Sequence, residues 1–230
     1  MPGMTKALER TMGRAERFLV QAQANQEILV VMEPYGYDAG RWAEGEALLS
    51  QLKEKVSANE SAFAKQLGAT DAFNLIFDEV WDQAQSLARL CATLFEGDTE
   101  TLALLGLHKR RDEETGESEI AWPRRKGALY HFVSWARHLY SAAQENESIA
   151  IVLADFGYPA DRLAQEAAEV EAMMETDSQQ EQAKALAQMS TEERDLAADA
   201  LRTWLRRAEM VARMTLKGQR QLLELLGLRA

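Results

Sequence analysis

Cysteine and long apolar runs are scarce in this sequence. Cys91 is the only cysteine among 230 residues, so a disulfide within the chain is excluded. Its place on an apolar helix face is typical of an inert, packed thiol. The longest uncharged apolar stretch, Ile28–Met32, is too short to cross a bilayer, and Met1–Leu19 has no apolar run of signal-peptide length. We therefore expect a soluble, cytoplasmic protein with no membrane partner.

Positive charge is also in short supply. The chain has 26 Lys and Arg against 37 Asp and Glu, a net charge of −11. Nucleic acids and anionic membrane surfaces are bound through basic surfaces, so neither is expected as a partner. From Leu201 onward the bases outnumber the acids, and two explanations compete. The basic segment either pairs with the acidic stretch Asp161–Asp199 on a neighbouring helix, which we favour, or forms a stripe for an acidic partner or RNA.

The motifs of common enzyme classes are missing. The chain has no nucleophile elbow, no phosphate-binding loop, no dinucleotide fingerprint and no Cys-x-x-Cys pair. None of the three histidines has a Glu three residues before it, as a di-iron bundle would require. His131 and His138 lie seven residues apart on one helix, and packing among nearby aromatic residues explains them better than zinc binding. We predict no catalytic residue, metal or cofactor, and we consider an enzyme the weaker alternative.

What the sequence does contain is a repeat. Tyr35-Gly36-Tyr37 returns as Phe156-Gly157-Tyr158 at an offset of 121 residues. Leu104-Leu105-Gly106-Leu107 returns as Leu225-Leu226-Gly227-Leu228 at the same offset. A gapless period of this length indicates duplication of a domain-sized unit. We call residues 1–107 the first copy and residues 126–230 the second copy, and we predict a charged linker over residues 108–125.

Each copy is predicted to form three long helices and one short helix. Only four prolines interrupt the chain, and apolar residues recur every three or four positions. In the first copy the long helices are predicted over residues 5–33, 38–67 and 70–96, with Gly68 ending the second. In the second copy, Ser190 and Glu193 have the spacing of a capping box that would start the sixth helix. The predicted fold is therefore an all-α helical bundle, and the sequence leaves open whether it is one bundle or two.

The short helices are crowded with leucine. Leu102, Leu104, Leu105 and Leu107 in the first copy match a similar group in the second. A helix this short has apolar residues on more than one face, so some leucines must meet the end of the bundle, the other copy or a second chain. We favour the second chain and predict a homodimer.

Two matched corners are the candidate ligand sites. Tyr37 and Arg41 stand four residues apart at the start of a predicted helix, and Tyr158 and Arg162 repeat the arrangement. A guanidinium near a helix N-terminus is suited to a small anion. The alternative, which we favour, is that each Tyr packs the corner while each Arg pairs with a neighbouring Glu.

The function predicted from these patterns is that of a non-enzymatic structural or protein-interaction protein that self-associates. The alternative is a regulatory or ligand-binding bundle with one small-anion site per copy at the Tyr-x-x-x-Arg corners.

Overall fold

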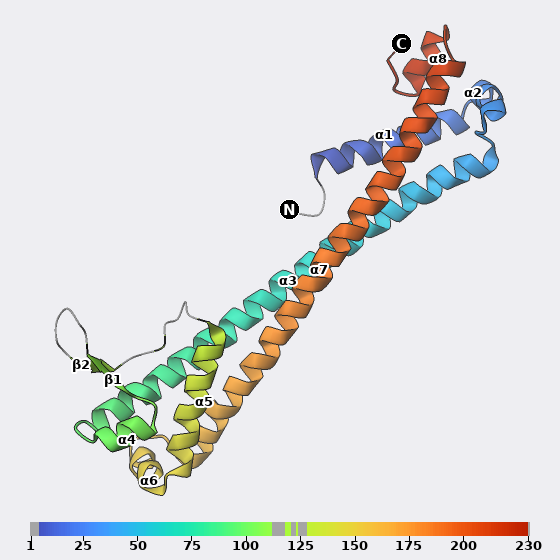
Figure 1. The fold of residues 1–230 in the computed structure, drawn as a ribbon. Helices are drawn as coiled ribbons and strands as arrows, with labels where there is room; N and C mark the ends of the chain where they lie inside the picture. The colour runs from blue at the N-terminus through green and yellow to red at the C-terminus, as the bar shows by residue number, and fades with distance from the viewer. Residues whose placement is uncertain (1–4, 112–117, 121–122, 124–127, 230) are drawn as a thin grey trace. The chain divides into compact units, whose positions relative to one another are not determined.

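A computed structural model describes residues 5–111, 118–120, 123 and 128–229, and it is almost entirely helical (Figure 1). Two short strands are the exception among the described residues. The prediction of an all-α helical bundle is confirmed at this level. None of the described helices is both long and apolar enough to cross a membrane. The elements in chain order are α1 (Lys6–Gln23), α2 (Gln26–Met32), η1 (Glu33–Tyr35), α3 (Ala39–Leu94), α4 (Thr99–Leu104), β1 (Lys109–Arg111), β2 (Ser118–Ile120), α5 (Leu129–Glu145), α6 (Glu147–Asp155), α7 (Ala160–Thr215) and α8 (Arg220–Leu225).

The chain forms two compact units that do not coincide with the two sequence copies. The first unit contains residues 1–67 and 182–230, and the second unit contains residues 68–181. Each unit therefore combines the beginning of one copy with the end of the other. Helices α3 and α7 contribute one half to each unit. The predicted division at residues 107 and 126 describes the repeat in the sequence, whereas the cores follow this other division.

The secondary structure repeats at the offset seen in the sequence. Helices α3 and α7 both have 56 residues and begin 121 residues apart, and α4 and α8 match in the same way. The glycines with positive φ also recur at this offset. They are Gly36 and Gly157, Gly97 and Gly218, and Gly106 and Gly227.

The prediction of three long helices per copy is wrong, because the second and third are one continuous helix. Gly68 lies inside α3, where a glycine costs roughly 1 kcal/mol relative to alanine but need not end a helix. Ser190 lies inside α7, and its hydroxyl donates a hydrogen bond to the Ala187 carbonyl oxygen (2.9 Å) instead of capping a new helix. Both helices therefore continue through residues that carry local stop signals.

The predicted first helix is broken instead, at Asn25. The Asn25 carboxamide oxygen accepts hydrogen bonds from the backbone N–H groups of Glu27 (3.0 Å) and Ile28 (3.4 Å), so it caps α2. Asn146 caps α6 in the same manner. Asparagine is among the best N-cap residues, and this signal was present in both copies.

The leucines of the short helices mostly face inward within their own units. Leu102, Leu105 and Leu107 are buried in the core of the second unit, and Leu223, Leu226 and Leu228 are buried in the core of the first. Only Leu104 and Leu225 stay exposed. The intramolecular alternative therefore holds for most of this cluster, because α4 packs with helices of the second copy and α8 with helices of the first.

The predicted linker contains a small hairpin. Strands β1 and β2 pair antiparallel, with Lys109 opposite Ile120 and Arg111 opposite Ser118. The rest of the linker prediction falls largely on residues 112–117, 121–122 and 124–127, which lie outside the described residues.

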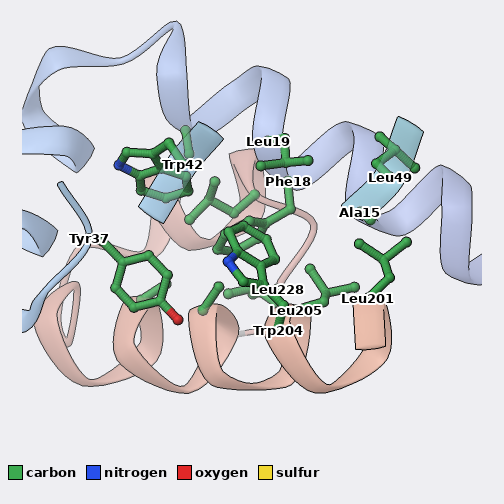
Figure 2. Packing of buried hydrophobic residues seen from close by; sticks show 14 of the residues in the cluster. Ala15, Phe18, Leu19, Tyr37, Trp42, Leu49, Leu201, Trp204, Leu205 and Leu228 are labelled. Atoms are coloured by element: carbon green, nitrogen blue, oxygen red, sulfur yellow. The ribbon is translucent and has the colours of Figure 1, made fainter. Parts of the chain in front are cut away.

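The core of the first unit is rich in aromatic rings. Phe18 from α1, Trp42 from α3 and Trp204 from α7 form mutual ring contacts with centroids 6.2 to 6.5 Å apart (Figure 2). Tyr37 joins them, with its ring centroid 5.4 Å from that of Trp42. This cluster places the Tyr37–Arg41 corner against α7.

Candidate functional site

The two corners have the same backbone. Gly36 and Gly157 both have φ of +84°, a left-handed conformation that favours glycine. The next residue, Tyr37 or Tyr158, returns its N–H to the carbonyl oxygen of Met32 or Leu153. The following long helix then begins, so each Tyr lies just before the first turn and each Arg lies within it. The backbone therefore places each Tyr and Arg pair at the start of a long helix in both units.

In the second unit the arginine is satisfied within the protein. The Arg162 guanidinium lies over the Tyr158 ring at 3.9 Å from its centroid. It donates to Glu166 Oε1 (2.8 Å) and to the Gly157 carbonyl oxygen (3.0 Å). Glu166 is buried and also accepts a hydrogen bond from the Tyr140 hydroxyl (3.0 Å). Arg162 therefore pairs with a buried carboxylate, which is the alternative in which the Arg pairs with a neighbouring Glu.

Burial explains the titration behaviour of this network. Desolvation raises the pKa of the Tyr140 hydroxyl, and the adjacent Glu166 carboxylate raises it further. Burial likewise raises the pKa of Tyr158, although the cation of Arg162 opposes that shift. Both phenols therefore stay protonated and neutral over the physiological range.

In the first unit the network is absent because its central carboxylate is missing. The position equivalent to Glu166 is Gly45, and the position equivalent to Tyr140 is Leu19. The indole of Trp204 fills the space, since a Cβ on Gly45 would lie 2.4 Å from its ring. Arg41 consequently turns to the exposed Glu44 (2.7 Å), a surface ion pair of the weak kind.

A pocket of about 710 Å³ opens beside this corner. It contains both predicted residues, Tyr37 and Arg41, together with a second cation, Arg207. Burial raises the pKa of Tyr37, and the charges of Arg41 and Arg207 lower it. The full lining is Tyr35, Gly36, Tyr37, Arg41, Glu44, Leu48, Asp199, Ala200, Thr203, Trp204, Arg207, Met210 and Val211.

Two smaller grooves lie at matched places in the two units. One of about 230 Å³ separates α1 from α3, and one of about 460 Å³ separates α5 from α7. Each is bridged by an ion pair, Glu16 with Lys53 (3.0 Å) and Arg137 with Glu171 (2.6 Å). The two ion pairs have opposite orientations. The acid is on the shorter helix in the first unit and on the longer helix in the second. All four side chains are largely exposed to solvent.

A buried polar cluster in the first unit was not predicted. Asn59 is fully buried, and its amide nitrogen donates to the hydroxyls of Ser190 and Thr191, both at 3.0 Å. Arg194 donates to the Asn59 carbonyl oxygen (3.0 Å). The cluster joins α3 to α7 and satisfies its own donors, which fits a role in setting the register of the two helices.

The described residues contain no group of three or more His, Cys, Asp or Glu that could hold a metal ion. His138 packs against Gly106, where a Cβ would approach its ring to 2.8 Å, and His131 lies beside Tyr130. Cys91 is buried, and desolvation raises the pKa of its thiol to about 12. A thiol so rarely ionised is a poor nucleophile.

The comparisons with known proteins return nothing. No family model matches the chain, and no curated protein or solved structure matches it significantly. Functional inference therefore depends on the chain's own residues.

Sequence reasoning missed Trp204 and Arg207, which complete the pocket from α7. The signal was an exchange between copies. Where the first unit has Gly45 and Trp204, the positions 121 residues away hold Glu166 and Gln83. Gly45 and Trp204 touch in the first unit, and both differ from their counterparts in the second.

Proposed function

We propose that this chain arose by duplication of a helical unit and acts as a non-enzymatic interaction protein that associates with a second copy of itself. The matched bounds of α3 with α7 and of α4 with α8, together with the glycines at positive φ, support the duplication. The self-association rests on one observation, which is the set of apolar residues that both copies leave exposed.

Large apolar side chains are exposed at equivalent positions of the two copies. Leu75 and Leu196 are the clearest pair, with 72% and 71% of their surfaces exposed. Three further pairs share this property: Val30 with Ile151, Tyr35 with Phe156, and Leu104 with Leu225. Exposed apolar residues are common singly, but nothing in the folding of either unit requires both members of a pair to stay apolar.

Other exposed apolar positions have not been kept. Val20 is matched by Ser141, Leu67 by Gln188 and Leu186 by Lys65. The four pairs that are apolar in both copies therefore differ from surface positions that are apolar in one copy only. A two-fold dimer presents the same residues from both partners, so paired apolar positions suit an interface between copies of this chain.

The test is the solution mass. Light scattering at micromolar concentration should give about twice the chain mass of 25.8 kDa. Replacing Leu75 and Leu196 together by serine should shift the protein toward monomer without loss of helicity. The matched control replaces Leu67 by glutamine and Leu186 by lysine, the residues that the other copy carries, and should leave the mass unchanged. A monomeric wild-type protein would reject self-association.

A further inference from the structure

We propose that the pocket of the first unit binds a small organic monoanion, namely an apolar body that carries one carboxylate. This function is separate from self-association. It concerns one unit alone. Three features support it: the size of the pocket, a cation without a carboxylate partner, and an apolar wall.

The size is that of a small-molecule site. At about 710 Å³ the pocket lies within the range of roughly 300–1,000 Å³ typical of ligand pockets. Its wall is built on helices α3 and α7, which the packed aromatic cluster holds together (Figure 2). The wall is therefore formed before a ligand arrives.

The pocket lining holds two cations, Arg41 and Arg207, and two anions, Glu44 and Asp199, and both anions are already paired. Glu44 pairs with Arg41 (2.7 Å), and Asp199 pairs with Arg202 (2.7 Å). Arg207 has no carboxylate partner among the described residues, although it faces Tyr37 closely enough to affect the pKa of its hydroxyl. A guanidinium with free donors beside an apolar wall recognises a carboxylate through a charge-assisted hydrogen bond.

The apolar part of the ligand would lie against Leu48, Trp204, Met210 and Val211, which line the same pocket. Trp204 is buried in the aromatic cluster and reaches the pocket only with the small part of its surface that stays exposed. A fully hydrated anion such as acetate would leave this wall wet, so the body of the ligand contributes as well as its charge.

The second unit supplies an internal control. At the positions equivalent to Leu48, Thr203 and Arg207 it carries Glu169, Asp82 and Ser86. The equivalent wall is therefore acidic, and its corner arginine is already bound to Glu166. The site is accordingly assigned to the first unit only, in contrast to one site per copy.

The experiment is calorimetric titration of the full chain with phenylacetate, benzoate and hexanoate. At least one should bind to one site per chain, and its uncharged amide should bind about tenfold more weakly or not at all, because the contact with Arg207 is lost. Acetate should be similarly weak. If none of the three acids binds, or if amide and acid bind equally, the proposal is wrong.

Two variants identify the pocket. Arg207→Ser introduces the residue of the second unit and should weaken binding about tenfold or more, whereas Arg206→Ser removes the same charge from an adjacent exposed position and should have no effect. Leu48→Glu should also abolish binding by placing an anion in the wall. Equal losses from Arg206→Ser and Arg207→Ser would mean general attraction to charge and would overturn the site. If no acid binds and Arg207→Ser instead turns a dimer into a monomer, the pocket holds a second copy of the chain.

Discussion

The two units fill the same backbone corner with different kinds of residue. In the first, Trp204 lies against Gly45 in a cluster of aromatic rings, and Leu19 belongs to the same core. In the second, the equivalent residues are Gln83, Glu166 and Tyr140, and a buried carboxylate links a phenol to a guanidinium. The same backbone corner therefore accepts an apolar or a polar filling. The apolar filling leaves the corner arginine, Arg41, paired with the exposed Glu44 in place of a buried carboxylate.

The largest expected effect comes from bringing the second unit's residue into the first. Trp204→Gln removes a buried indole and should lower the free energy of unfolding by about 3–5 kcal/mol, because no neighbour can fill the cavity. Chemical denaturation followed by circular dichroism measures the loss. The matched control is Gln83→Leu, which removes a buried amide oxygen that has no hydrogen-bond partner and should be neutral or stabilising. Equal losses from both variants would contradict the contrast between the units.

The polar filling should depend on each of its hydrogen bonds. Tyr140→Phe deletes the donor to Glu166 Oε2 and should cost about 1.5–3 kcal/mol, since the acceptor is a buried carboxylate. Leu19→Met, at the equivalent apolar position, should cost less than about 1.5 kcal/mol because volume is conserved. Thermal and chemical denaturation of the two variants in parallel provide the comparison. An unchanged stability for Tyr140→Phe would mean that the buried network contributes little.

A smaller effect should separate two glycines of the same helix. Gly45→Ala places a Cβ at 2.4 Å from the Trp204 ring and should destabilise the protein by about 1–3 kcal/mol through overpacking. Gly68→Ala meets nothing within 4 Å and should stabilise the protein by about 0.5–1 kcal/mol, as alanine favours helix more than glycine does. Opposite signs in denaturation midpoints are the expected result. A stabilising Gly45→Ala would show that the indole can move aside.

The helical character could be predicted from sequence because apolar periodicity and turn glycines are local signals. Helix continuity could not, since Gly68 and Ser190 carry local stop signals although both lie inside continuous helices. The arrangement of the two cores could not be predicted from the sequence either. Each unit draws on both copies, and a helix pattern does not say which partner its apolar face meets.

The candidate site was predicted in part for the same reason. Tyr37 and Arg41 lie on one corner, so their neighbourhood follows from spacing. Trp204 and Arg207 come from a helix more than 150 residues away, and nothing in their own segment marks them. Only the paired exchange of Gly45 with Glu166 and of Trp204 with Gln83 carries that information.

The smallest expected effect concerns pH and again compares equivalent positions, Cys91 in the second unit and Ala212 in the first. Burial raises the pKa of the Cys91 thiol from 9.0 to about 12. Below pH 9 the thiol is protonated in both folded and unfolded chains. Above pH 9 the unfolded chain loses the proton while the folded chain keeps it, so stability falls until about pH 12. The slope attributable to this group is roughly 1.4 kcal/mol per pH unit.

Stability measured by denaturation at pH 8 and pH 10 should therefore fall more steeply for the wild type than for Cys91→Ala, which introduces the residue found at position 212. Parallel curves for the two proteins would mean that the thiol ionises as easily in the folded chain as in the unfolded one.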